Sequence, residues 1–193
     1  MPSSGKKNPP KLDRVVIRYA ERVYEDIITA IKNKKVPCDV HRVPDYKSSS
    51  PHMEVEYYIQ LEHRPINLFV DSKCSGGDIF VPDDEKKPIK ITVHGWGVPA
   101  RDMFVHEFVH YLQSKHGIFH GTAPHTVVAD YLDSSNERDA YFIQFLTHAN
   151  LKRVKDPTRA IKTYFSKRGL WQEMKPQTRK HHIDRLTDLL ALR

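Results

Sequence analysis

Cysteine is scarce in this sequence. The chain of 193 residues holds two, Cys38 and Cys74, which are too few for a disulfide scaffold and do not form a Cys-x-x-Cys pair. A zinc knuckle built on cysteines and a thioredoxin-type redox site are therefore excluded. We expect both cysteines to be buried, reduced thiols, with a single bridge between them as the alternative.

Long apolar runs are also lacking. No stretch approaches the run of about 18 apolar residues that a membrane-spanning helix needs. Residues 1–10 are polar and proline-rich, where a secretory signal would have an apolar core. We therefore expect no membrane partner and a cytoplasmic protein, with secretion by another route left open.

The net charge of +7 comes from one end of the chain. Residues 150–193 hold 12 Lys and Arg against 4 Asp and Glu, whereas residues 1–149 hold 19 against 20. Such a basic segment either contacts an anionic partner, such as nucleic acid, or forms a solvated helix face. We favour the solvated face, because the charges lack the interleaved aromatic residues of a stacking platform. The residues that would contact phosphates lie within 152–180: Lys152, Arg153, Lys155, Lys162, Lys167, Arg168, Arg179 and Lys180.

The hydrophobic pattern changes its period along the chain. Apolar residues recur every three or four positions over residues 12–32, which predicts a long amphipathic helix. After a polar stretch at 36–51, runs rich in β-branched and aromatic residues predict a small, mainly antiparallel sheet with strands at 55–61, 66–70, 79–81 and 89–93. Later patterns predict a short segment at 126–132 and helices at 100–116, 136–150, 157–166 and 177–190. Helix, strands and then helices predict an α+β fold in one domain.

The predicted helix at 100–116 carries the pattern His-Glu-x-x-His, as His106-Glu107-Phe108-Val109-His110. At about 100° per residue, the two histidines lie one turn apart on the same side, so both imidazoles can reach one metal ion. Glu107 lies beside them and can take a proton from a metal-activated water without being a ligand. Zinc is the metal that suits two neutral imidazoles. The alternative is a pair of core histidines in a half-buried helix.

A catalytic zinc needs a third protein ligand and an open position for water. His116 has the metzincin spacing, but Gln113 stands where that pattern needs a glycine, and an unbroken helix would point His116 away. The methionine of a metzincin turn would be Met174, after residues that look helical. His120 and His125 follow the helix and could serve as ligands in the manner of SprT-like proteases.

Glu137 is the third candidate and the one we favour. It lies in the first turn of the predicted helix at 136–150, with the small Ala140 one turn later to let two helices approach closely. The chain here resembles the small gluzincins of bacteria and phages, whose first helix carries His-Glu-x-x-His and whose second carries Glu-x-x-Ala-Tyr. The second motif is Glu137-Arg138-Asp139-Ala140-Tyr141, preceded by Tyr131-Leu132 as in several such proteins. The resemblance covers about residues 89–150.

Tyr141 departs from the thermolysin-like gluzincins. Those proteins carry an aspartate four residues after the ligand glutamate, which holds the first histidine through its other ring nitrogen. A different acceptor must do this here. Asp102, one turn before His106, is a candidate, although a negative charge there also stabilises a helix N-terminus. The donor to the tetrahedral oxyanion stays open among Tyr131, His120, His125 and Tyr141.

The resemblance implies a minimal zincin-like domain, with a small sheet packed on the active-site helix and flanking N- and C-terminal helices. It implies one Zn²⁺ per chain, held by His106, His110 and Glu137, and an endopeptidase in which Glu107 is general base and acid. We expect an exposed sheet edge at 89–93 to pair with an extended protein or peptide substrate. The expected organisation is a disordered arm, a metallopeptidase domain and a basic helical extension packed on that domain, at 1–10, 11–150 and 151–193.

Three other functions use the same residues. A SprT-like DNA-associated protease would need a loop histidine as ligand and DNA for activity. A non-catalytic, zinc-stabilised binding module would keep the metal without needing Glu107. An effector protease would share the chemistry but cleave a single host protein.

Overall fold

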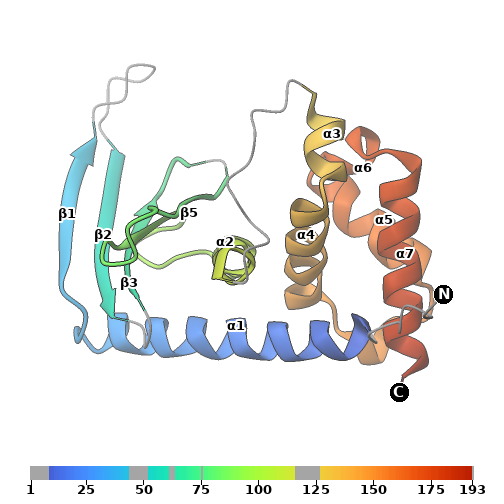
Figure 1. Ribbon diagram of the computed structural model, residues 1–193, viewed down its shortest axis with the longest axis horizontal. Helices are drawn as coiled ribbons and strands as arrows, with labels where there is room; N and C mark the ends of the chain where they lie inside the picture. Colours follow the sequence, from blue (N-terminus) through green and yellow to red (C-terminus); the bar gives the residue numbers. More distant parts are fainter. Residues whose placement is uncertain (1–8, 44–51, 61–63, 75, 116–126, 193) are drawn as a thin grey trace. The chain divides into compact units, whose positions relative to one another are not determined.

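The computed structural model describes residues 9–43, 52–60, 64–74, 76–115 and 127–192. These residues form the α+β fold that the sequence predicts, with helices before and after the strands of one sheet (Figure 1). The elements run in the order α1 (Pro9–Lys32), β1 (Cys38–Val43), β2 (His52–Gln60), β3 (Pro65–Asp71), β4 (Asp78–Phe80), β5 (Ile89–His94), α2 (Arg101–Lys115), α3 (Val128–Asp133), α4 (Ser135–His148), the 3₁₀ turn η1 (Leu151–Arg153), α5 (Pro157–Lys167), α6 (Leu170–Glu173) and α7 (Pro176–Ala191).

Contacts within the chain divide it into two compact units. The sheet unit is Ala20–Gly121, and the helical unit is Met1–Tyr19 together with Thr122–Arg193. The predicted organisation into segments 1–10, 11–150 and 151–193 stays a prediction. Of the predicted arm, residues 1–8 lie outside the described residues, and α1 begins at Pro9. No helix in the described parts of the chain is long and apolar enough to cross a membrane.

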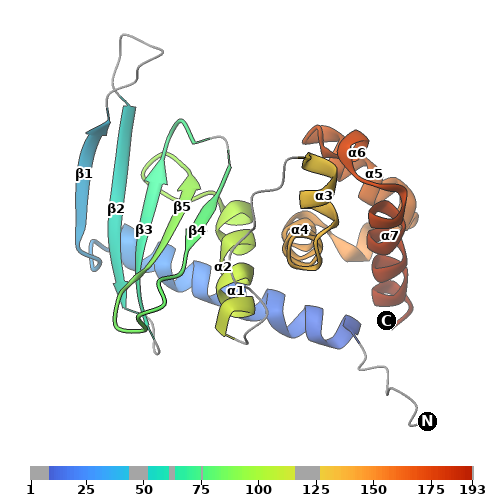
Figure 2. The same cartoon turned by 45° about the horizontal axis from the view of Figure 1, so that its top comes forward.

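The sheet has the strand order β1-β2-β3-β5-β4 (Figure 2). β3 and β5 are parallel and the other neighbours are antiparallel, so the sheet is mainly antiparallel as predicted. The expectation that residues 89–93 form an exposed edge is wrong. β5 lies between β3 and β4, and its side chains Ile89, Ile91 and Val93 are fully buried. The edge on that side is the three-residue strand β4, which the sequence predicts as a strand at 79–81 without indicating its place at the edge of the sheet.

Strand β1 is missing from the sequence prediction, which has a polar stretch there. It pairs with β2, with Cys38 opposite Tyr57, and its Val40 side chain is 56% exposed. An edge strand held by backbone pairing shows no buried periodicity, so the pattern gives no signal. The cysteines are free thiols as expected, but not buried, since Cys38 is exposed in this edge strand and Cys74 is half-buried.

Alternation along the strands builds the core of the sheet unit. Ile66, Leu68 and Val70 of β3 point to the same buried side as the inward residues of β5. Helix α2 packs against β4 and β5. Its fully buried Phe104 stacks on Phe108 at 5.7 Å between ring centroids. Burying an apolar side chain of this size contributes about 1.5–3 kcal/mol, so this packing holds α2 on the sheet.

The helical unit has an aromatic core of its own, to which α4, α5 and α7 contribute. Phe142 and Phe165 are fully buried and enclose the ring of His182, at centroid distances of 6.0 and 5.0 Å. The guanidinium of Arg185 on α7 bonds Asp13 of α1 and Asp139 of α4. These contacts fix the helix that carries Glu137 within its unit.

Candidate metal centre

The turn between β5 and α2 sets the direction in which α2 starts. The Ala100 amide donates to the His94 carbonyl at 2.8 Å. Two tyrosine hydroxyls from other elements hold the turn. Tyr57 of β2 donates to the Gly97 carbonyl at 2.5 Å, and Tyr24 of α1 donates to the Pro99 carbonyl at 3.0 Å. Gly97 has φ +68°, a left-handed conformation that glycine adopts without strain.

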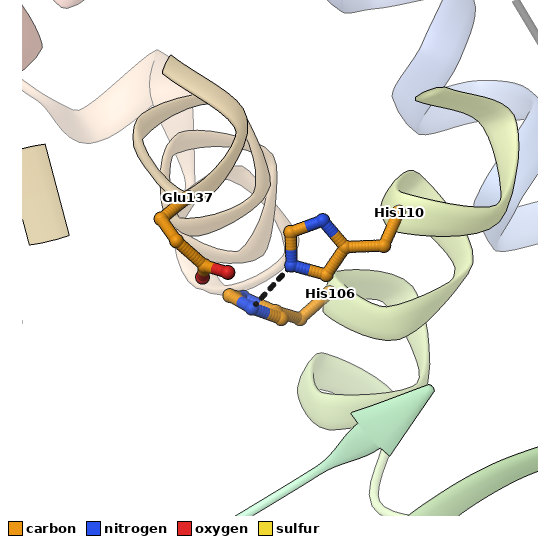
Figure 3. A group of neighbouring side chains, drawn as sticks. All are labelled: His106, His110 and Glu137. Atoms are coloured by element: carbon orange, nitrogen blue, oxygen red, sulfur yellow. Dashed lines mark hydrogen bonds between the residues drawn. The ribbon is translucent and has the colours of Figure 1, made fainter. Parts of the chain in front are cut away.

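The two motif histidines lie side by side on α2, as the spacing predicts (Figure 3). The His106 and His110 side chains are buried, with 6% and 3% exposure. Their Nε2 atoms are 3.2 Å apart. Two imidazoles that bind one tetrahedral zinc at about 2.05 Å place their nitrogens about 3.3 Å apart. The pair therefore already has the separation that a shared metal ion requires.

Gln113 orients one of these histidines. Its amide oxygen lies 2.7 Å from Nδ1 of His110, and both side chains are buried. An amide oxygen only accepts hydrogen bonds, so Nδ1 carries the hydrogen and the lone pair of Nε2 is left for a metal. In the sequence, Gln113 is interpreted solely as the residue in place of a metzincin glycine. Its position three residues after His110 on one helix face is the signal that could have revealed this role.

Glu137 joins the two histidines in the one group of potential metal ligands found among the described residues. One ligand atom from each of His106, His110 and Glu137 lies within 4.8 Å of the others. Figure 3 shows the three side chains. Glu137 is in the first turn of α4, where the Ser134 hydroxyl caps the helix by accepting the Glu137 amide hydrogen at 3.4 Å. Its side chain is 1% exposed, and a buried carboxylate is stable when it is paired or binds a cation. The residues thus form a buried group that could bind a metal ion.

Glu107 is buried on α2 but is not a member of that group. Its carboxylate lies against Gly77, the residue directly before β4. A Cβ atom at Gly77 would be 2.8 Å from both Cγ and Cδ of Glu107, closer than real Cβ contacts come. The absence of a side chain at Gly77 therefore makes room for the carboxylate between α2 and the edge of the sheet.

Cys74, which precedes β4, is not poised to act as a thiolate. Burial raises the pKa of its thiol, and the charges of Asp71 and Glu107 raise it further against one backbone hydrogen bond. The thiol donates to the Gly76 carbonyl at 2.6 Å. A protonated thiol is a poor metal ligand and nucleophile, which agrees with a site made of histidines and carboxylates.

Of the remaining predicted site residues, three lie in the described part of the chain and three lie outside it. Asp102 is half-buried in the first turn of α2, and Tyr131 is half-buried on α3. The Tyr141 ring packs against Phe165 at 6.3 Å between centroids. Their proposed roles in orienting His106 or donating to an oxyanion stay predictions. The alternative ligands His116, His120 and His125 lie outside the described residues.

Comparison of the chain with protein-family models, with curated proteins and with solved structures found no match. The resemblance to small gluzincins therefore rests on the two short motifs.

Proposed function

We propose that this protein is a zinc-dependent endopeptidase. The observation that carries the proposal is the convergence of the His106 and His110 Nε2 atoms, 3.2 Å apart, with a Glu137 ligand atom within 4.8 Å. Two imidazoles and one carboxylate are a ligand set typical of catalytic zinc. A structural zinc site closes with four protein ligands, whereas three leave a position for water or substrate.

The chain supplies the rest of the chemistry through Glu107. Zinc held by His106, His110 and Glu137 would polarise the scissile carbonyl and lower the pKa of a water, so that the water becomes a nucleophile when it loses its proton. Glu107 takes the proton of the attacking water as general base and passes it to the leaving amine as general acid. Its burial at 5% exposure keeps competing solvent from the carboxylate. Gly77 keeps the space that the carboxylate occupies.

We place the substrate at the β4 edge of the sheet. β4 pairs with β5 on one side and is the last strand in the sheet order, so its other side can pair with an extended peptide. β4 begins directly after Gly77, against which Glu107 lies. A peptide added to β4 would have its backbone fixed beside the general base. The 58% exposed ring of Phe80 offers such a peptide an apolar contact.

A library of peptides from a digested proteome tests the proposal without choosing a substrate. The zinc-loaded protein should generate new peptide N-termini, detected by mass spectrometry. A chelator should abolish them, and stoichiometric zinc should restore them. A zinc-loaded protein that generates no new N-termini would contradict the proposal.

A further inference from the structure

The helical unit holds a cavity of about 630 Å³ that the peptidase chemistry does not use. It lies where the end of α4, the turn η1 and helix α5 meet. Figure 1 labels α4 and α5. Its volume is within the range of small-molecule sites, about 300–1,000 Å³. Five cationic side chains line it against one carboxylate, Asp156: Arg153, Lys155, Arg159, Lys167 and Arg168.

Four of these five cations have no acidic partner among the described residues. Elsewhere in the unit, Lys175 pairs with Asp130, and Lys180 with Asp184. No ion pair with a residue that the structure describes involves four of the lining cations: Arg153, Lys155, Arg159 and Lys167. The single carboxylate of the lining is engaged locally, where Asp156 accepts the Arg159 amide hydrogen at 3.0 Å. Positive charge is therefore concentrated around a concave site, which favours an anionic ligand.

Arg168 is held in place before any ligand arrives. Its guanidinium lies 3.8 Å from the centroid of the Tyr164 ring and bonds Nε2 of His148 at 3.2 Å. A guanidinium only donates hydrogen bonds, so Nε2 of His148 is the acceptor in this contact. A pre-oriented guanidinium loses less entropy when it binds a phosphate or carboxylate.

The cavity also has an apolar wall. Phe145, Ala149, Val154, Ala160 and Tyr164 contribute to its lining. A free inorganic anion would use the cations but leave that wall uncovered. We propose that this cavity binds an organic phosphate of nucleotide size, with its phosphate on the arginines and lysines and its organic part against the apolar wall.

The cavity separates the predicted phosphate contacts into two sets, one that lines it and one that does not. Four of the predicted phosphate contacts line the cavity: Arg153, Lys155, Lys167 and Arg168. Arg159 also lines it and is not among the predicted contacts. The other predicted phosphate contacts do not line it: Lys152, Lys162, Arg179 and Lys180. A diffuse basic surface would use both sets equally.

Two double variants of the full chain distinguish binding in the cavity from binding to a diffuse basic surface. Arg153→Ala with Arg159→Ala removes two charges from the cavity, and Lys152→Ala with Lys162→Ala removes two exposed charges outside it. Adenosine 5′-monophosphate is the probe, and its binding is measured by isothermal titration calorimetry at low ionic strength. Adenosine and inorganic phosphate are the comparison ligands. Thermal unfolding of each variant checks that both pairs keep the fold.

We expect the monophosphate to bind the natural sequence and the control pair within about twofold of each other. The cavity pair should bind at least about tenfold more weakly, because charge-assisted hydrogen bonds are lost. Adenosine should bind at least about tenfold more weakly than its monophosphate. Equal weakening by both pairs, equal binding of adenosine, or no binding of the monophosphate would each overturn the proposal.

A single-stranded oligonucleotide identifies the source of the phosphate. If the monophosphate displaces it, and the cavity pair weakens it more than the control pair, one nucleotide of a strand occupies the cavity. If the two pairs weaken the oligonucleotide equally and the monophosphate does not displace it, the basic residues act as a surface and the cavity proposal is wrong.

Discussion

The amide oxygen of Gln113 lies 2.7 Å from Nδ1 of His110, inside the protein and one turn beyond the His-Glu-x-x-His motif. This contact fixes which nitrogen of His110 carries the hydrogen. It therefore gives the histidine its metal-binding form before the metal arrives. Partners of this kind raise metal affinity by orienting the ligand and by increasing its basicity.

Gln113→Leu should weaken zinc binding about 10- to 100-fold, because leucine fills the space without accepting the Nδ1 hydrogen. Gln113→Glu keeps an acceptor and should retain most of the affinity. Zinc affinity is measured by competition with a chromophoric chelator, with Ser114→Ala as the neighbouring control. Unchanged affinity in Gln113→Leu would show that the contact does not orient His110.

Glu137→Ala should remove the third zinc ligand. We expect one zinc per chain in the natural protein and loss of most of it in the variant after dialysis against a weak chelator. Ser135→Ala, in the same turn of α4 and exposed, is the control. Elemental analysis gives the occupancy. Full occupancy in Glu137→Ala, with loss in His116→Ala or His120→Ala, would replace this assignment by the metzincin or SprT-like one.

Gly77→Ala should lower peptidase activity while leaving zinc bound. The new methyl group would meet the Glu107 carboxylate and displace the proposed general base, which is not a member of the ligand group. Gly76→Ala is a matched control, because a Cβ atom at Gly76 has nothing within 4 Å. Casein cleavage and zinc content are measured for both variants. Equal activities would mean that Glu107 does not need the space at Gly77.

The sequence predicts the elements whose buried faces are periodic or whose ends are capped. The helix at 136–150 is confirmed as Ser135–His148, with Ser134 as its N-cap. Met174 follows the short helix α6, which agrees with the helical pattern before it. The formation of β1 and the order of β4 and β5 in the sheet depend on which strands pair. A local sequence pattern does not indicate which strands pair.

How much of the candidate site the sequence can predict depends on what fixes the position of each side chain. His106 and His110 share a helix, so their spacing fixes their geometry. Glu137 could be nominated only through its resemblance to a known motif. The contact of Glu107 with Gly77 depends on how α2 packs against β4, which no local rule supplies. The contact of Gln113 with His110 depends on the orientation of the Gln113 side chain, which its spacing in the sequence does not give.

His182 should make the fold sensitive to acid. Burial, with the charges of His181, Arg185 and Arg138, lowers its pKa from 6.5 to about 3. Below pH 6.5, His182 binds a proton in the unfolded chain but not in the folded chain. The free energy of unfolding therefore falls by about 2 kcal/mol by pH 5. His182→Phe, whose ring can stack between Phe142 and Phe165, should remove this part of the pH dependence.

Urea unfolding at pH 7 and pH 5 measures the effect of His182. A chelator is present throughout, so that loss of metal at the lower pH does not contribute. His148→Asn, at an exposed histidine, is the control and should keep the pH dependence of the natural sequence. If His182→Phe loses as much stability at pH 5 as the natural sequence, His182 is not the acid-sensitive group.

Glu107→Gln tests whether this protein hydrolyses peptide bonds with Glu107 as general base. The amide is nearly isosteric with the carboxylate but cannot take a proton, and Glu107 is not in the ligand group. Cleavage of the peptide library is compared at equal zinc occupancy. We expect unchanged folding and zinc content, with a rate reduced about 10²- to 10⁴-fold. A variant that cleaves as fast as the natural protein would contradict this expectation.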